Sequence, residues 1–394
     1  MNAFAKLENE VVKIGLCTDC GTCVGVCPNR AIAMSYSKEE PEAIGECSPQ
    51  CNLCNEVCPG KNIPMLDFDK MLFGRHRSAN EMLLGVGQSF FKCHAVDPVV
   101  RANGGGGGVV SALLIHALES SLIDAAIVVT MSNERPWVAI PNIATNREGV
   151  IAAAQAKDTV VPVNSILGEA IERGFKRVGV VGLPCHIHGI RKAQLIGRPD
   201  WVAKNVKFLI GLFCGLNYNF RATEHIIGEW AEVPLEQVAK LEYRAGEYPG
   251  TFTVTTKKGE VIGVPLRARR HTTQGHEHDR CLVCYDYANE AADVSIGDYF
   301  GFEMMRGVPG QSTAITRTDI GKKLIEGAEA ANYVHTGSVE MEDFYRGGFE
   351  VKKHGGAFRI FERKRFGLPY PDFQLPLDFR SMPRKLNLTH PLIS

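Results

Sequence analysis

The sequence predicts a small, cysteine-rich α+β domain followed by a larger α/β domain built on a mixed β-sheet. Three observations predict this division. Eight of the 13 cysteines lie between residues 17 and 58. From about residue 90, short apolar strands alternate with helices, which is the pattern of a partly parallel sheet. Residues 251–266 alternate apolar and polar side chains around a glycine turn and indicate an antiparallel hairpin.

The same changes in composition and in the pattern of apolar residues divide the chain into four segments. We expect a cysteine-rich domain at 1–65, a helical or irregular connector at 66–90, a large domain at 91–340 and a C-terminal extension at 341–394. Within the large domain we expect a helix over 109–119 and another near 165–173. The expected strands are 124–130, 177–182, 207–213 and 292–296. The extension is rich in Arg, Phe and Pro and shows little periodicity, so we expect it to wrap the body or a partner.

The eight N-terminal cysteines form two runs, each ending in Cys-Pro. The first run has the spacing C-x2-C-x2-C-x3-C-P, and the second repeats it with one extra residue. In bacterial-type two-cluster ferredoxins the fourth cysteine of each run ligates the other [4Fe–4S] cluster. The expected ligand sets are Cys17, Cys20, Cys23 and Cys58 for one cluster, and Cys47, Cys51, Cys54 and Cys27 for the other. A disulfide framework or zinc is the alternative, but two such runs are unusual for zinc and nothing indicates secretion. The pattern predicts single-electron transfer.

Composition excludes several classes of function. Lys+Arg and Asp+Glu both number 44, so no net basic charge attracts nucleic acid or anionic lipid. The apolar stretches are too short for a membrane span, and the first residues lack the apolar core of a signal peptide. Thirteen cysteines without an export signal indicate metal chemistry in a reducing compartment. We expect the cytoplasm of an anaerobic prokaryote.

Four of the remaining cysteines indicate a further site. Cys185 follows an apolar strand and opens a helix, Cys214 ends another strand, and Cys281 and Cys284 form a C-x2-C pair. Ligands collect beyond the carboxyl ends of parallel strands, and a helix N-terminus favours the thiolate form. These four thiols therefore suggest a third [4Fe–4S] cluster. The alternative is that Cys185 and Cys214 are buried thiols while the C-x2-C pair holds zinc. Nearby histidines, His186, His188, His271, His276 and His278, are given no role.

Five consecutive glycines, 104–108, precede the helix expected at 109–119. Polyglycine is often a flexible tether, but this run lies inside a domain and directly before a helix. Glycine lets backbone N–H groups approach a phosphate, and the helix start adds positive potential. The run is therefore a candidate phosphate site for a nucleotide or flavin, although it lacks the GxGxxG pattern.

Three motifs together resemble a known family. They are R-x-N-G-G-G-G-G-V-V-S-A-L-L from residue 101, G-L-P-C-H-I-H-G-I-R-K from 182, and C-L-V-C-Y-D-Y-A-N-E-A-A-D-V-S-I-G-D from 281. With the N-terminal cysteine runs, they resemble the coenzyme F420 hydrogenase/dehydrogenase beta-subunit family. The resemblance covers nearly the whole chain. It implies an FAD bound in the large domain beside a [4Fe–4S] cluster, with the deazaflavin F420 docking against the flavin.

Family positions map onto this sequence one by one. The cluster cysteines of the family fall on Cys185, Cys214, Cys281 and Cys284. The flavin-binding turn and its flanks fall on Arg101, Asn103, Gly106, Gly107, Gly108, Val109, Ser111 and Lys157. Two positions depart from the family pattern: Gly106 replaces a serine, and Asp158 stands where tyrosine is common. Both changes fall in the expected flavin pocket.

The resemblance implies an iron–sulfur flavoprotein oxidoreductase. It would be the electron-input subunit of a larger redox complex, moving electrons between coenzyme F420 and a partner through FAD and three [4Fe–4S] clusters. The flavin would accept two electrons together as hydride and release them one at a time, so no acid–base triad is expected. The expected partners are subunits of a hydrogenase, formate dehydrogenase, or heterodisulfide or sulfite reductase-like enzyme, or ferredoxin. Three alternatives stay open: NADH as the donor, a ferredoxin-driven reductase related to chlorophyll-pathway enzymes, and a flavin-less conduit of clusters.

Overall fold

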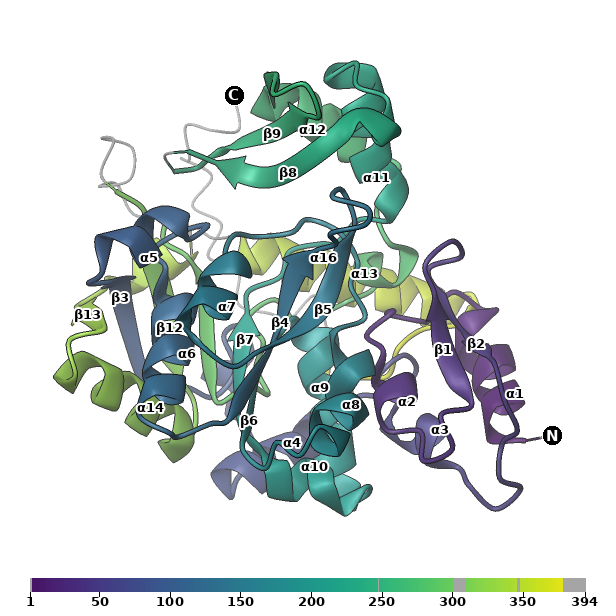
Figure 1. Cartoon of the computed structure of the whole chain (residues 1–394). Helices are drawn as coiled ribbons and strands as arrows, with labels where there is room; N and C mark the ends of the chain where they lie inside the picture. The colour runs from purple at the N-terminus through teal and green to yellow at the C-terminus, as the bar shows by residue number, and fades with distance from the viewer. Residues whose placement is uncertain (1, 247, 301–308, 346–347, 378–394) are drawn as a thin grey trace.

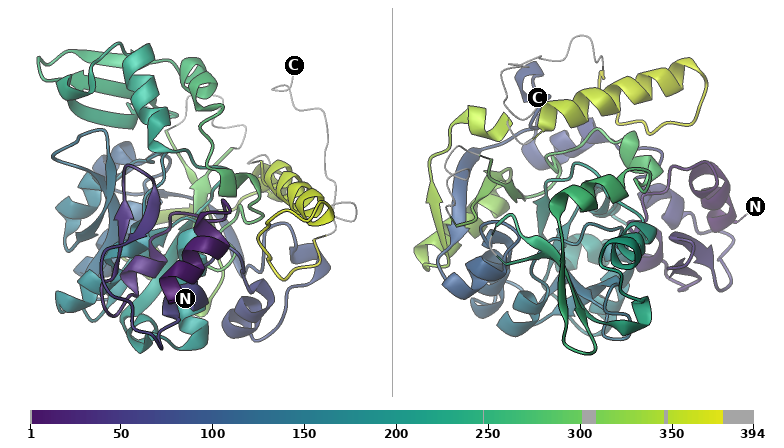
Figure 2. Two further views of the ribbon diagram at one scale, coloured as in Figure 1. Left: turned by 90° about the vertical axis from the view of Figure 1, so that its right-hand side faces the viewer. Right: turned by 90° about the horizontal axis from the view of Figure 1, so that it is seen from above.

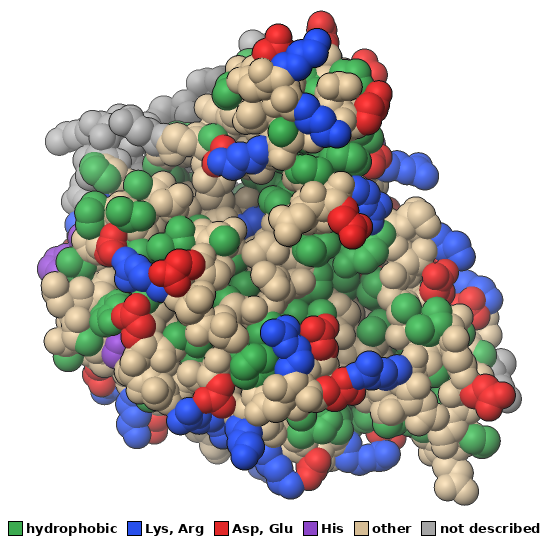
Figure 3. Space-filling view, viewed as in Figure 1, with side chains coloured by type: hydrophobic (Ala, Val, Ile, Leu, Met, Phe, Trp, Pro, Cys, Tyr) green, Lys and Arg blue, Asp and Glu red, His purple; other side chains and the backbone are tan. Residues whose placement is uncertain are grey.

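The computed structural model describes residues 2–246, 248–300, 309–345 and 348–377. A small N-terminal unit packs on the side of a large α/β body, and a three-stranded sheet lies above the body (Figure 1). In this described part, no helix combines the length and apolar character that crossing a bilayer requires. Acidic and basic side chains are interspersed over the face shown in Figure 3, in keeping with equal numbers of the two.

The N-terminal unit is made of short helices and one hairpin. Its elements are α1 (Ala3–Leu7), the π-helix η1 (Glu8–Val12), α2 (Thr22–Gly25), β1 (Ile32–Ser35), β2 (Glu40–Ala43) and α3 (Leu53–Val57). Strands β1 and β2 pair antiparallel, with Ile32 opposite Ala43. A small apolar cluster that includes Phe4 and Leu7 lies between the helices and the cysteine loops.

The body is built on one eight-stranded mixed sheet. The strand order is β13-β3-β12-β11-β7-β6-β4-β5. The four strands β11, β7, β6 and β4 are parallel, and the remaining strands add antiparallel at the two edges. Their bounds are β3 (Ser89–Ala95), β4 (Ala125–Met131), β5 (Ala139–Ala144), β6 (Val178–Gly182), β7 (Val206–Leu212), β11 (Val294–Asp298), β12 (Ser312–Thr316) and β13 (Val334–Gly337).

Helices cover both faces of this sheet, because successive strand residues are apolar on both sides. In β4, Ala125 and Ile127 belong to one core, whereas Ala126 and Val128 belong to the other. One face is covered by α5 (Pro98–Asn103), α6 (Val109–Glu119), α7 (Arg147–Ala152) and α14 (Asp319–Ala330). The other face is covered by η3 (Val163–Ile166), α8 (Leu167–Glu172), α9 (Pro184–Ile196) and α10 (Asp200–Asn205).

The upper lobe has a core of its own, which includes Tyr243, Phe252 and Val254. Its sheet has the order β10-β9-β8, all antiparallel. Its elements are α11 (Phe220–His225), η4 (Ile226–Trp230), η5 (Leu235–Gln237), β8 (Val238–Ala245), β9 (Thr251–Thr256), β10 (Val261–Val264) and α12 (Leu266–Thr273). The chain then returns to the body through α13 (Asp279–Leu282).

Two segments close the side of the body beside the cysteine loop 281–284. The first contains α4 (Met65–Phe73) and η2 (Ala79–Glu81), and the second contains α15 (Met341–Tyr345) and α16 (Phe349–Arg365). The long helix α16 lies along the surface of the body (Figure 2). It buries Phe349, Ala357 and Ile360 against the body, so it belongs to the folded core.

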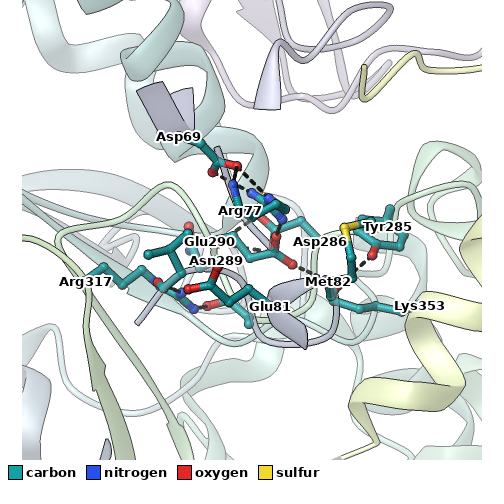
Figure 4. Close-up of polar contacts among 12 residues, drawn as sticks. Asp69, Arg77, Glu81, Met82, Tyr285, Asp286, Asn289, Glu290, Arg317 and Lys353 are labelled. Atoms are coloured by element: carbon teal, nitrogen blue, oxygen red, sulfur yellow. Dashed lines mark hydrogen bonds and ion pairs between the residues drawn. The ribbon is translucent and has the colours of Figure 1, made fainter. Parts of the chain in front are cut away.

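A buried network of charges joins these segments. Arg77 donates to both carboxylate oxygens of Asp69, at 2.8 and 2.9 Å, and also pairs with Glu290. Lys353 of α16 approaches Glu290 from the other side and donates to the carbonyl of Met82 at 3.0 Å (Figure 4). The side chains of Arg77, Glu290 and Lys353 are no more than 1% exposed. Pairing is what makes burial of such charges tolerable.

Most expected elements are confirmed. The helix expected at 109–119 is α6, the strand expected at 177–182 is β6, and the hairpin expected at 251–266 is β9–β10. The helix expected at 165–173 is a 3₁₀ turn followed by α8. After residue 340, where the sequence shows little periodicity and no helix was predicted, residues 349–365 form the 17-residue helix α16. Its polar faces and two glycines weaken its apolar period. Residues 378–394 of the expected extension lie outside the described part.

The buried network gives a prediction about stability. Replacing Glu290 with Gln leaves Arg77 and Lys353 without their shared counter-charge, so we expect the free energy of unfolding to fall by about 3–5 kcal/mol. Urea unfolding under anaerobic conditions measures this change. The matched control is Glu169→Gln, which removes an exposed pair with Arg173 and should cost less than about 1 kcal/mol. Equal stability of the two variants would contradict the prediction.

Candidate functional site

The candidate site is a cavity of about 370 Å³ at the carboxyl ends of the parallel strands, here called the large cavity to distinguish it from two much smaller cavities of about 20 and 30 Å³ around the N-terminal cysteines. Strands β4, β6, β7 and β11 contribute their last residues to its wall, among them Val129, Gly182, Leu212 and Asp298. This edge is where open α/β sheets bind ligands. The volume lies within the usual range for small-molecule sites, roughly 300–1,000 Å³.

The glycine run and the start of α6 form one side of the large cavity. Gly104, Gly105, Gly106 and Gly108 line it, and α6 begins at Val109 directly after Gly108, whose φ is +72°. A Cβ on Gly106 would lie 2.9 Å from Asp298 Oδ1, and one on Gly107 would lie 2.7 Å from a backbone carbonyl. Glycine is thus required here because neighbouring strands pass so close. The amide N–H of Gly107 donates to Ser312 Oγ at 3.0 Å.

Lys157 reaches the large cavity from the loop after α7. Its ammonium group donates to the carbonyls of Ala153, Ala154 and Gln155 at 2.5–3.1 Å, and so caps the carboxyl end of that helix. Burial lowers the pKa of Lys157 to about 8. An anionic or carbonyl-bearing ligand beside this ammonium group would stabilise its protonated form.

Two ion pairs cross between the upper lobe and the body beside the large cavity. Arg244 of β8 donates to Asp298 Oδ2 and to the carbonyl of Gly105, both at 2.8 Å. Asp158 pairs with Arg269 at 2.5 Å. Asp158, Arg244 and Asp298 all line the cavity. Asp158 was singled out from the sequence, but the two ion pairs were not, because the partners lie far apart along the chain.

His186 lies in the wall of the large cavity, in the first turn of α9. Its Nδ1 accepts a hydrogen bond from the amide of Leu183 at 2.9 Å, so Nε2 carries the proton donated to the carbonyl of Val161 at 3.0 Å. Burial lowers the pKa of His186 to about 4. The ring is therefore uncharged at neutral pH. It lines the cavity, so it would contact a ligand bound there.

Four thiols lie directly behind the large cavity, and we call them the body thiol set: Cys185, Cys214, Cys281 and Cys284. The cavity residues Leu183 and Phe213 come just before Cys185 and Cys214. Burial raises the pKa of Cys185, and the charges of Cys20 and of the other three thiols of the set raise it further. The structure therefore brings together the four cysteines that the sequence singled out from three segments.

The N-terminal cysteines surround two small cavities. Cys17, Cys20, Cys23 and Cys58, the inner set, line a cavity of about 20 Å³. Cys27, Cys47, Cys51 and Cys54, the outer set, line one of about 30 Å³. These groupings have the crossed arrangement expected from the spacing. The pKa of Cys54 is raised to about 12 and that of Cys58 to about 11. Burial is the main cause, and the charge of neighbouring thiols is the second. Such thiols need a strong positive centre to become thiolates.

The thiols of the inner set and those of the outer set each surround a cavity rather than a single point. Among the described residues, no group of three or more His, Cys, Asp or Glu side chains is arranged to hold a single metal ion. Four thiols around one cavity suit a cluster of several iron atoms better than one zinc ion.

A hydrogen bond joins the inner set to the body thiol set. His278 Nε2 lies 2.6 Å from Asp19 Oδ2, and the two side chains are 14% and 4% exposed. Burial opposes protonation of His278, but the hydrogen bond to Asp19 and the neighbouring Cys281 thiol raise its pKa to about 10. Although burial disfavours its thiolate, the neighbouring His278 ring lowers the pKa of Cys281. Nothing in the sequence distinguished His278 from the nearby histidines.

The cofactor residues expected from the sequence divide into two groups. Gly106, Gly108, Val109, Ser111 and Lys157 line the large cavity. The other three lie outside its wall: Arg101 donates to the carbonyls of Pro309 and Gly310, Asn103 donates to that of Val99, and Gly107 packs against β3 and β12. Those three residues therefore do not face the cavity; they hold together the backbone segments around it.

Comparison with protein families matches three regions of the chain. Residues 11–33 match a 4Fe-4S binding domain. Residues 90–168 match the N-terminal part of the coenzyme F420 hydrogenase/dehydrogenase beta subunit, and 175–342 match its C-terminal part.

Known proteins give the same result. The coenzyme F420 hydrogenase beta subunit of Methanosarcina barkeri is 34% identical over 66% of this chain and 87% of its own length. The coenzyme F420-dependent sulfite reductase of Methanocaldococcus jannaschii is 28% identical over 84% of this chain, but over only 49% of that protein. A chain of the F420-reducing [NiFe] hydrogenase complex of Methanosarcina barkeri superposes with a TM-score of 0.60 and 30% identity, covering 74% of this chain and 97% of that one. The chain therefore belongs to the coenzyme F420 hydrogenase/dehydrogenase beta-subunit family, with a 4Fe-4S binding domain at its N-terminal end.

Proposed function

We propose that this chain is the electron-input subunit of a redox complex. It exchanges electrons with coenzyme F420 through an FAD in the large cavity, and moves them through three [4Fe–4S] clusters to a partner. One observation carries the proposal: the large cavity, the body thiol set, the inner set and the outer set adjoin one another in that order. Cys185 interacts with Cys20 of the inner set, and Cys23 interacts with Cys54 of the outer set.

The residues of the large cavity fit a flavin. Apolar side chains such as Val129, Val181 and Leu212 offer flat surfaces to a ring system, and the start of α6 offers free amide groups and positive potential to a phosphate. Gly106, Gly108, Val109, Ser111 and Lys157 would hold the cofactor there. When bound, FAD accepts two electrons as hydride and releases them one at a time.

The protein side chains keep this exchange in place. Phe213 and Tyr287 lie between the large cavity and the cysteine loops, and exclude water from that wall. The Arg244–Asp298 pair holds β8 of the upper lobe against β11, which fixes the roof of the cavity. Lys157 lines the same cavity and would supply a cation to a flavin bound there.

The partner would receive or supply electrons at the outer set, which lies in the unit farthest from the large cavity along this order. The relatives are named as components of F420 hydrogenase and as an F420-dependent sulfite reductase. We propose a partner of the same kind: a subunit of a hydrogenase, formate dehydrogenase, or heterodisulfide or sulfite reductase-like enzyme, or ferredoxin.

The third cluster predicts a definite iron content. Anaerobically purified protein should contain about twelve iron atoms per chain, four for each cluster, and Cys284→Ala should remove about four. Iron and acid-labile sulfide assays measure this. The matched control is Cys93→Ala, because the Cys93 thiol is buried in β3, away from the three sets, and its loss should leave iron unchanged. Unchanged iron in Cys284→Ala would refute the third cluster.

The flavin site predicts a variant that separates flavin from iron. Gly106→Leu would fill the large cavity and collide with Asp298, so we expect flavin absorption to be lost while iron stays at the wild-type level. Gly228→Leu is the control, since nothing lies within 4 Å of a Cβ at that exposed position. Flavin retained at full occupancy in Gly106→Leu would place the cofactor elsewhere.

The electron donor is predicted by kinetics. Anaerobic stopped-flow mixing with F420H2 should bleach the flavin within the enzyme's turnover time, whereas NADH and reduced ferredoxin, tested in parallel, should bleach it more slowly. If F420H2 left the flavin oxidised while another donor reduced it, the F420 assignment would be wrong.

A further inference from the structure

His278 lies between the inner set and the body thiol set: its side chain bonds to Asp19, and its backbone carbonyl accepts from the amide of Cys281. Its Nε2 is bonded to Asp19, which lies between Cys17 and Cys20 in the loop of the inner set. On the other side, His278 opens α13, whose third residue is Cys281 of the body thiol set. The pair Asp19–His278 is therefore a continuous polar link between the two sets, made across 259 residues of sequence.

The second ring nitrogen of His278 is buried and closes no hydrogen bond of ordinary geometry among the described residues. Buried polar atoms are rarely left in this state, so an acceptor is expected at that position. His278 is the N-cap of α13, and Cys281 is its third residue, which is the position that a capping side chain faces. Since Nε2 is engaged by Asp19, Nδ1 is the atom left to face the sulfur.

The backbone holds the ring in this position. The amide of His278 donates to the carbonyl of Asn217, and its own carbonyl accepts from the amide of Cys281, at 3.0 and 2.8 Å. On the other side, Asp19 has a φ of +51° and is 4% exposed. A residue other than glycine adopts this conformation at a cost, and such positions concentrate where geometry is functional. Both ends of the link are thus fixed.

We propose that His278 is a positioning residue that tunes the body cluster: it donates through Nδ1 to the Sγ of Cys281 and through Nε2 to Asp19, and so raises the reduction potential of the cluster that Cys281 holds. This inference rests on the proposed function, because it needs a cluster at the body thiol set. A hydrogen bond to a ligating sulfur withdraws electron density and stabilises the reduced cluster. With clusters bound at both sets, one electron passing between them would oxidise one cluster and reduce the other.

The test is an EPR-monitored redox titration of the whole protein, with iron assayed in parallel. The signal missing from Cys284→Ala identifies the body cluster. In His278→Ala we expect its reduction equilibrium constant to fall about tenfold, the size of one charge-assisted hydrogen bond, which equals about 59 mV for a one-electron couple. His276→Ala is the matched control: His276 lies on the same loop but bonds to His225 and Asn219, so the potential should not move.

Two conservative variants separate a tuning role from a structural one. The amide of His278→Asn reaches the position of Nδ1 and should keep most of the wild-type potential, whereas that of His278→Gln reaches the position of Nε2 and should behave like His278→Ala. A wild-type potential in His278→Ala with all iron retained would overturn the inference alone. Loss of the body cluster from all three variants would make the role structural and overturn it as well. Wild-type protein with only about eight irons would overturn the proposed function, and this inference with it.

Discussion

The close packing of α2 on α9 and on η3 sets the distance between the two domains and between their cysteine sites. A Cβ on Gly189 of α9 would lie 2.1 Å from Thr22 Oγ1, and one on Gly25 of α2 would lie 1.9 Å from the carbonyl of Asn164. Only glycine allows backbones to approach this closely. Because Cys20 precedes α2 and Cys185 begins α9, this contact also brings the inner set next to the body thiol set. A bulkier side chain at either glycine would push the two sites apart.

Helix α9 also contacts three sites: the large cavity, the body thiol set and the inner set. Its first turn carries Cys185 and His186 toward the cysteine loops and the large cavity. Further along, Lys192 donates to the carbonyls of Cys58 and Asn62, at 2.5 and 3.0 Å, and so reaches the last ligand loop of the inner set. Burial lowers the pKa of Lys192, while the thiols of Cys58 and Cys20 oppose that effect. One rigid helix therefore aligns the cavity and two thiol sets, which electron transfer over short distances requires.

Local signals made much of this arrangement predictable. The spacing of the cysteine runs indicated which thiols group together, and the apolar strands before Cys185 and Cys214 indicated the edge of the sheet where the large cavity lies. Groups paired across long sequence separations left no local pattern, which is why Arg244–Asp298 and His278–Asp19 were not foreseen. The glycine run was predicted as a phosphate loop on conformational grounds, but Gly107 is also required by contact with β3 and β12. Helix α16 was missed because tertiary packing rather than periodicity stabilises it.

Buried charge is treated differently in the two parts of the body, and this contrast supports the cluster assignment independently of spacing. Beside the cysteine loop, carboxylates are matched by cations: Asp69 and Glu290 by Arg77 and Lys353, and Asp293 by Arg191. The body thiol set lacks such a balance. Its four thiolates would face three cations, Lys352, Arg280 and His278, and His278 is already paired with Asp19. A buried group of four negative charges is unstable without further positive charge. The carboxylates are thus matched by cations more completely than the four thiols would be, and this difference fits the iron–sulfur cluster that we propose for the body thiol set.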